Sequence, residues 1–189
     1  MPTPKAAASF TGCVCVMVAA TLLLWGQLPS YGVGRPPSVE EIELWDVIVG
    51  PEGKELPPGE GTAMVGREVF SLRCAECHGS EGQGADKGEA LVGGEGTLTS
   101  SEPLKTVGSY WPYATTIWDY VNRAMPFDRP GTLTHDQVYA VVAYLLYLNG
   151  IIGEEEVMNA SSLPQVTMPN RNGFVPDPRP DLGEMDRSP

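Results

Sequence analysis

The residues of this chain best suited to chemistry form the run Cys74-Ala75-Glu76-Cys77-His78. Two thiols separated by two residues lie on one helical turn, and each can form a thioether with a vinyl group of a porphyrin. His78 follows directly and can place its imidazole on the iron as the proximal ligand. The C-x-x-C-H spacing is therefore typical of a covalent attachment site for a c-type haem.

Two other uses of a C-x-x-C pair fit this chain less well. A thioredoxin-like redox pair needs a βαβ context, whereas the flanks here are helical and rich in glycine. A zinc site needs about four protein ligands, and the remaining candidates, Cys13, Cys15 and His135, are too few and badly placed. We therefore predict one covalently attached haem c, held by the two cysteines and the histidine of the motif.

The balance of charges limits the partners of this protein. The 189 residues include 12 Lys and Arg against 24 Asp and Glu, a formal net charge of −12. No basic patch is present to displace counterions from phosphates, which argues against nucleic acid. A negatively charged membrane surface is disfavoured for the same reason. A protein partner with a basic docking face is favoured.

Residues 1–32 have the pattern of an export signal. Lys5 supplies the positive start, and Gly12 to Trp25 is an apolar run without a charge. Ser30-Tyr31-Gly32 offers small residues at the cleavage-determining positions, so we expect cleavage after Gly32 and a periplasmic protein. At about 15 residues the run is short for a membrane span, so no stable span is expected and a retained anchor is the alternative. The mature chain would carry 11 basic and 24 acidic residues, a net charge of −13.

Composition predicts a helical domain over 63–152 between two arms. Residues 33–62 are rich in Pro and Gly, so we expect an extended arm without a helix, anchored by one short strand within 44–49. A loose linker is the alternative. Residues 153–189 carry six prolines and no helical period. We expect a second arm here, with a disordered far end.

Three helices are expected inside this domain. The first spans 63–77, and Gly66 within it lacks a side chain and would let another helix cross close by. The second spans 113–124 and would bury an apolar and aromatic face. The third begins at Thr134-His135-Asp136-Gln137, which has the form of a capping box, and ends at Asn149-Gly150. A glycine-rich loop between the first two helices would wrap the haem edge.

Three features in order resemble the class I cytochrome c fold: a helix ending in C-x-x-C-H, the segment Met125-Pro126-Phe127, and a helix containing Val-Ala-Tyr-Leu-Leu. The resemblance covers about residues 63–150 and implies a mostly α fold in which the first and last helices cross. By this resemblance Met125 is the sixth ligand of the iron, and Pro126 and Phe127 would shield its sulfur. The remaining matches are Gly66 and Phe70 on the first helix, with Tyr144 and Leu145 on the last.

A narrower resemblance is to the monohaem domain of SoxD-type cytochromes. It rests on three segments: Thr106 to Thr116, Arg123-Ala124-Met125-Pro126-Phe127, and Met168 to Phe174. Such proteins are the cytochrome subunits of sulfane or sulfite dehydrogenases and take electrons from a molybdenum subunit. Met168 begins a second Met-Pro pair and is the alternative sixth ligand, in an arm that would fold back across the haem.

The function implied is electron transfer, with no catalysis by the chain itself. A molybdenum-containing dehydrogenase subunit would be the donor, and a downstream cytochrome or oxidase the acceptor, in the oxidation of sulfur compounds. The alternatives are service to another periplasmic dehydrogenase, and a haem sensor or enzyme with an open sixth position. An interaction protein without haem is a further alternative, which the mass of an attached haem would exclude.

We predict that Cys77→Ser leaves a poorly accumulated and largely unfolded chain, because the haem would fill much of the space between the helices. Circular dichroism and thermal melting of the purified variant check this. Native helicity with a sharp melting transition in a haem-free Cys77→Ser protein would contradict the idea that haem is part of the core.

Overall fold

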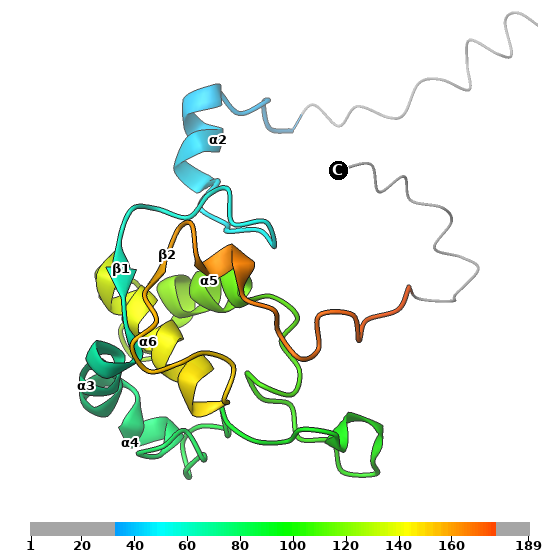
Figure 1. Ribbon diagram of the computed structural model, residues 1–189. Coiled ribbons are helices and arrows are strands. Elements are labelled where there is room, and N and C mark those ends of the chain that lie inside the picture. Colours follow the sequence, from blue (N-terminus) through cyan, green and yellow to red (C-terminus); the bar gives the residue numbers. More distant parts are fainter. Residues whose placement is uncertain (1–32, 177–189) are drawn as a thin grey trace, which may run out of the picture. The chain divides into compact units, whose positions relative to one another are not determined.

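The computed structural model describes residues 33–176, which fall into two compact units, 33–46 and 47–176. The predicted export signal, 1–32, and the far end of the second arm, 177–189, lie outside the described residues. The first unit contains helix α2 (Val39–Trp45). The elements of the second unit, shown in Figure 1, are β1 (Glu60–Gly61), α3 (Ala63–Arg73), α4 (Ala75–His78), the 3-10 helix η1 (Thr97–Thr99), α5 (Ala114–Ala124), α6 (His135–Leu148), β2 (Met158–Asn159) and the 3-10 helix η2 (Leu163–Gln165).

The predicted helices are present, with one interruption. Helix α6 begins with the expected capping box: the Gln137 backbone N–H donates to Thr134 Oγ1 at 3.3 Å, and the Thr134 N–H donates to Gln137 Oε1 at 2.9 Å. Helix α5 agrees with its prediction to within one residue. The first helix is divided at Cys74, whose backbone (φ −125°, ψ −36°) departs from helical geometry, so α3 and the short α4 are separate elements.

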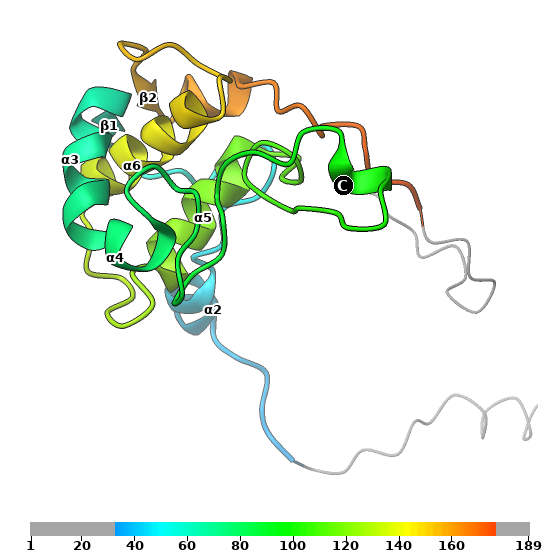
Figure 2. The same cartoon turned by 90° about the horizontal axis from the view of Figure 1, so that it is seen from below.

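Helices α3 and α6 cross in direct backbone contact, and both views show them packed together (Figures 1 and 2). A Cβ on Gly66 would lie 1.9 Å from the carbonyl oxygen of Ala140, so only glycine permits this approach. One turn further on, the rings of Phe70 and Tyr144 meet edge to face with centroids 5.4 Å apart. The predicted crossing of the first and last helices is therefore confirmed.

The third helix of the core, α5, packs against α6 through a buried aromatic pair. Trp118 is buried, as expected, together with Ile117 and Val121, and its ring lies 5.4 Å from that of Tyr139. Burial raises the pKa of Tyr139 to about 12, so its hydroxyl stays protonated and donates to the carbonyl of Pro57 at 2.8 Å. This bond fixes the chain that leads into β1.

Two expectations for the first arm are wrong. Residues 33–62 do contain a helix, α2, and there is no strand within 44–49. The physical reason is that the Pro and Gly residues of the arm leave a continuous run, 38–49, free of both, and Ser38 begins it with a capping box to Glu41. Of the predicted anchor residues only Val49 is buried.

The described part of the second arm, up to residue 176, folds against the domain. Strand β2 pairs antiparallel with β1, with Gly61 opposite Met158. The side chains of Met158, Leu163 and Met168 belong to the same buried cluster as the helices. The two flanking segments are thus held to each other and to the core. Among the helices within residues 33–176, none combines the length and the apolar character that a membrane crossing requires.

Asp119 of α5 joins the helix to the segment that precedes β1. Its Oδ1 accepts from the backbone N–H of Val49 and from Arg123 Nε, each at 2.9 Å, and its Oδ2 pairs with Arg123 Nη2. Burial by itself would raise the pKa of Asp119, but the hydrogen bonds from Arg123 and Val49 outweigh it, so the pKa lies below its ordinary value.

We predict that Gly66→Ala lowers the free energy of unfolding by about 3 kcal/mol or more, because backbone and not a movable side chain opposes the new methyl group. Urea unfolding measures this. Gly50→Ala is the matched control, since the nearest atom to its Cβ would be a carboxylate oxygen of Glu55 at 3.7 Å. Equal stability of the two variants would contradict the close crossing.

We predict that Asp119→Asn costs about 1–3 kcal/mol at pH 7, through the loss of charge-assisted hydrogen bonds. A carboxylate with a lowered folded-state pKa stabilises the protein above the unfolded-state value, about 3.9, and this contribution is lost as the pH falls through the folded-state pKa. The stability gap between wild type and Asp119→Asn should therefore shrink below about pH 4.

Urea unfolding from pH 7 to pH 3 measures that gap. The control is Asp128→Asn, which removes the exposed pair with Arg129 and should change little at any pH. A gap for Asp119→Asn that stays constant down to pH 3 would show that its carboxylate makes no specific contribution.

Candidate functional site

The C-x-x-C-H run is carried by α4, directly after the crossing helix α3. The backbone N–H groups of Cys77 and His78 both donate to the carbonyl of Cys74, at 3.1 and 3.0 Å, which winds the run into one tight turn. Both thiols are free and partly buried. Burial raises the pKa of Cys74 to about 11, so its free thiol is neutral at pH 7. The turn therefore presents two neighbouring sulfur atoms and an imidazole from five consecutive residues.

The ring of His78 is held by the backbone of the following loop. Its Nδ1 lies 2.9 Å from the carbonyl oxygen of Glu89. Since a carbonyl only accepts, we assign the proton to Nδ1, which leaves the lone pair on Nε2 for a metal. A carbonyl partner of this kind fixes the tautomer and orientation of a ligating histidine.

Gly88 allows the loop to reach the histidine. A Cβ at this position would lie 2.7 Å from the carbonyl oxygen of Cys77 and 3.1 Å from His78 Nδ1. Sequence reasoning predicted a loop that wraps the haem edge but missed Gly88 and the Glu89 carbonyl as partners of the motif. The Glu89 side chain is exposed, and a carbonyl belongs to every residue type, so only the surplus of glycines hinted at a close approach.

Met125 caps the C-terminal end of α5 and packs against the core while remaining partly exposed. The next residue, Pro126, is buried. Phe127 is 86% exposed, so it does not shield the Met125 sulfur in the expected way. Met125 follows α5 and His78 ends α4, so the two residues lie at the ends of different helices.

Met168 is in a different environment from Met125. It is 1% exposed and belongs to the buried cluster, so protein atoms surround its sulfur. The residues that follow lie on the aromatic segment before α5. Asn170 Nδ2 donates to the carbonyl of Tyr110 at 2.7 Å, and the Arg171 guanidinium lies 4.2 Å from the ring centroid of Tyr113. Phe174 meets the Tyr110 ring edge to face at 5.3 Å. The segments Thr106 to Thr116 and Met168 to Phe174, two of the three that carry the narrower resemblance, are thus in contact.

Residues of the helical domain offer apolar surface and unpaired buried donors, which suit a large, flat, mostly apolar group with acidic edges. Leu91, Trp111 and Met125 pack on the core and keep part of their apolar surface uncovered. Trp118 Nε1 and Arg73 Nε are buried donors without a hydrogen-bond partner among the residues that the structure describes. A porphyrin with carboxylate side groups has both apolar faces and acceptors that match these residues.

Within residues 33–176 no three His, Cys, Asp or Glu side chains gather closely enough to hold a metal ion. His135 is exposed, and its ring lies 5.9 Å from that of Trp118.

Three comparisons relate this chain to known proteins. The model of the cytochrome c family matches residues 63–149. The Cbb3-type cytochrome c oxidase subunit CcoP of Azospirillum sp. (strain B510) is 37% identical over 100 residues, which cover 48% of this chain and 32% of that protein. The chain thus spans about a third of the length of this curated relative. A chain in the crystal structure of the sulfane dehydrogenase SoxCD from Paracoccus pantotrophus is 42% identical, with a TM-score of 0.72, and the match covers 85% of this chain and 80% of that one.

Proposed function

Because the chain belongs to the cytochrome c family, we propose that it is a periplasmic monohaem cytochrome serving as the cytochrome subunit of a molybdenum-containing sulfane or sulfite dehydrogenase. It accepts single electrons from the molybdenum subunit and passes them to a downstream cytochrome or oxidase. The observation that carries this proposal is the match to a SoxCD chain over 85% of the protein. Export would use residues 1–32.

The extent of that match separates it from a general likeness to cytochromes. The cytochrome c family model spans 87 of 189 residues, or 46% of the chain. A match over 85% must therefore include much of the flanking chain. The flanks contain β1, β2 and the segment Met168 to Phe174, which are features that a generic cytochrome c domain does not require. Similarity to the SoxCD chain in the flanking segments, and not only in the cytochrome c region, favours assembly into a similar complex over the use of the same cofactor alone.

Members of this family hold haem c covalently, and in this chain Cys74 and Cys77 would carry the thioethers. When bound, haem c takes up and releases one electron at its iron. His78 would supply the proximal nitrogen, Nε2. Its Nδ1–H donates to the Glu89 carbonyl, which makes the imidazole a stronger electron donor and prevents the ring from rotating. An apolar lining around the bound haem would exclude water and so limit the reorganisation that accompanies a change of charge.

Met125, and not Met168, is proposed as the sixth ligand. A residue that binds a group beyond the protein atoms needs a face that other side chains do not cover. Met125 has such a face, whereas Met168 is enclosed by the core. Met125 also lies just before α6 at the end of α5, whose position is fixed by the packing of Trp118 on Tyr139. A thioether ligand raises the reduction potential of the iron.

We predict that Met125→Ala abolishes the weak sulfur-to-iron absorption band and lowers the midpoint potential, because the thioether is removed. Met168→Ala should keep the band and nearly the same potential. It should instead lower the free energy of unfolding by about 2–5 kcal/mol, through the cavity it leaves in the core. Visible spectra, a redox titration and urea unfolding of both variants check this. Loss of the band in Met168→Ala alone would assign the ligand to the C-terminal segment.

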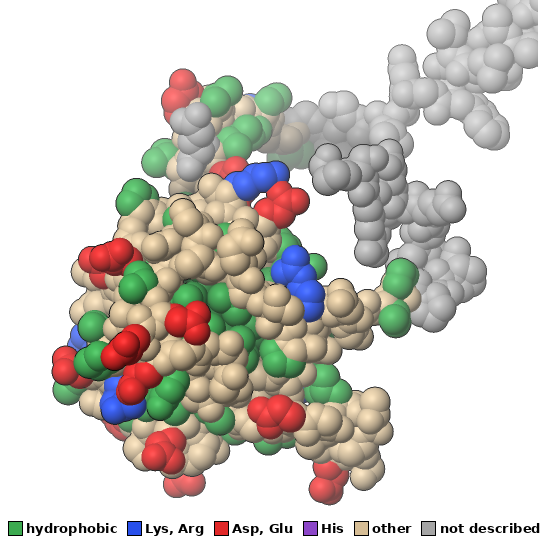
Figure 3. All heavy atoms as spheres, viewed as in Figure 1, with side chains coloured by type: hydrophobic (Ala, Val, Ile, Leu, Met, Phe, Trp, Pro, Cys, Tyr) green, Lys and Arg blue, Asp and Glu red, His purple; other side chains and the backbone are tan. Residues whose placement is uncertain are grey.

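The partner is tested by purification of the haem-loaded chain from its native periplasm. We expect a copurifying protein that contains molybdenum by elemental analysis and reduces the haem when a sulfane or sulfite substrate is added. Acidic side chains are spread over the face seen in Figure 3, with few Lys and Arg between them, so the reduction rate should fall as salt rises from 20 to 500 mM. A copurifying protein without molybdenum would identify another dehydrogenase and overturn the assignment to a sulfane or sulfite dehydrogenase. Rapid binding of carbon monoxide would indicate an open sixth position and a sensor or enzyme.

A further inference from the structure

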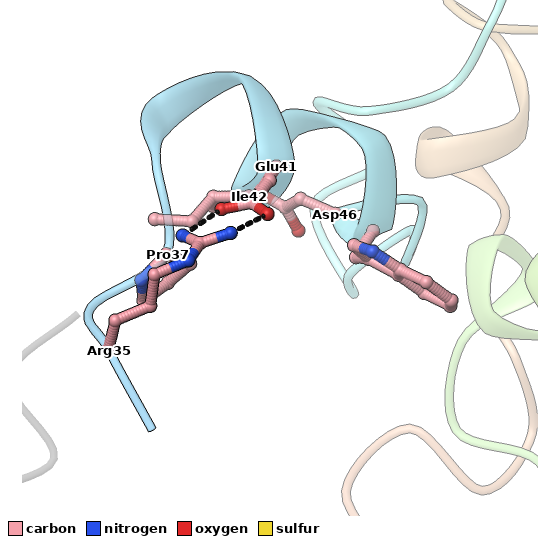
Figure 4. A pocket seen from close by; sticks show the side chains of 6 residues that line it. Arg35, Pro37, Glu41, Ile42 and Asp46 are labelled. Atoms are coloured by element: carbon pink, nitrogen blue, oxygen red, sulfur yellow. Dashed lines mark hydrogen bonds and ion pairs between the residues drawn. The ribbon is translucent and has the colours of Figure 1, made fainter. Parts of the chain in front are cut away.

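Helix α2 exposes large apolar side chains that a free surface helix does not need. Trp45 is 83% exposed, Leu44 76% and Ile42 50%, and Val39 is also exposed. Val39, Ile42 and Trp45 recur every third residue and so share one face of the helix. Ile42 and Trp45 line a hollow together with Arg35, Pro37, Glu41 and Asp46, which Figure 4 shows from close by.

The local sequence holds this short helix in shape. Seven residues are too few for a stable isolated helix, and these apolar side chains are not buried. Two local devices compensate. Ser38 and Glu41 form a reciprocal capping box. Both terminal nitrogens of Arg35 donate hydrogen bonds to the Glu41 carboxylate, Nη1 to Oε2 at 2.7 Å and Nη2 to Oε1 at 2.5 Å (Figure 4). These bonds are exposed and add little to global stability, so their main effect is to preorganise the helix.

We propose that α2 is a docking helix, which inserts Ile42 and Trp45 into an apolar groove with a basic rim on the molybdenum-containing dehydrogenase subunit. The inference rests on the proposed function and adds to it the element that binds the partner. Binding through a preformed helix avoids most of the ordering entropy that a flexible arm would lose. Tryptophan is also the residue type most enriched among side chains that dominate protein interfaces.

The charges of α2 favour a different protein as its partner over a membrane surface or a second copy of the chain. The first turn carries Glu40 and Glu41, the last turn carries no basic residue, and Asp46 caps the end. Arg35, the basic residue closest to α2 in the sequence, is engaged with Glu41. An interfacial membrane helix needs Lys or Arg on its polar face to meet anionic lipids. A second copy of α2 would bring acidic residues together in a chain whose net charge is already −12. A groove rimmed by Lys or Arg places positive charge against the acidic residues of α2.

The match to the SoxCD chain points to the same partner. The match covers 85% of this chain, which is far more than the cytochrome c region, 63–149. The chain outside that region, which contains α2, therefore takes part in the match to a large extent. Similarity that extends this far beyond the cytochrome c region favours the same kind of partner.

The test compares two double variants of the full, haem-loaded chain. Ile42→Ala/Trp45→Ala removes the apolar face of α2. Met64→Ala/Val65→Ala removes two exposed apolar side chains from α3 and is the matched control. The probe is the purified molybdenum subunit that accompanies the wild-type chain, and its Kd is measured by calorimetry. We expect the α2 variant to bind at least 30-fold more weakly and the control to bind within about twofold of wild type. Visible spectra and midpoint potentials should be unchanged in both.

Electron uptake distinguishes this inference from the proposed function. If the α2 variant is still reduced by substrate at a saturating concentration of the molybdenum subunit, the function stands and α2 acts in docking. Equal Kd values for wild type and the α2 variant overturn the inference while the function stands. The inference is also overturned if the α2 variant keeps its Kd for the molybdenum subunit but loses binding to anionic vesicles or loses self-association. A wild-type chain that neither binds the molybdenum subunit nor takes its electrons overturns both.

Discussion

The contact on which the rest of the structure depends is the meeting of α3 and α6 at Gly66 and Ala140. Two helices whose backbones approach this closely have little freedom to slide, because any shift meets main-chain atoms. Helix α3 continues into α4 with only Cys74 between them, so the crossing also fixes the turn that carries the cysteines and His78. Helix α6 holds α5 through Tyr139 and Trp118, and the far end of α5 carries Met125. One packing contact therefore governs the placement of residues far apart in the chain.

The sequence was informative where chemistry depends on the identity of a side chain. The C-x-x-C-H motif, the capping box at Thr134 and the small residue at position 66 each have a local signature, and the helices they predict are present. Helix α2 was missed because composition was averaged over 33–62. The arm is rich in Pro and Gly as a whole, but the run 38–49 contains neither and begins with a capping residue. A window matched to the length of a short helix would have found it.

Other features were out of reach because they join distant residues or use the backbone. Asp119 binds the main chain of Val49, 70 positions away, and nothing near either residue marks the pair. The carbonyl of Glu89 holds His78, and no residue type encodes a carbonyl. Met168 resembles Met125 in sequence, since each precedes a proline, yet the fold buries one and leaves the other partly open. Burial distinguishes the two methionines, and it is a property of the whole fold.

The pairing of β1 with β2 has a consequence for how this domain is used. The chain enters the helical region at Glu60 and leaves it at Asn159, and these two residues are partners in one short antiparallel ladder. The helical region between them is closed by the ladder, so additional chain can be attached at either side without separating α3 from α6. A domain whose ends meet in this way is readily combined with other domains. Fusion to a larger protein therefore requires no redesign of the haem-binding region, only a new continuation at each end of the ladder.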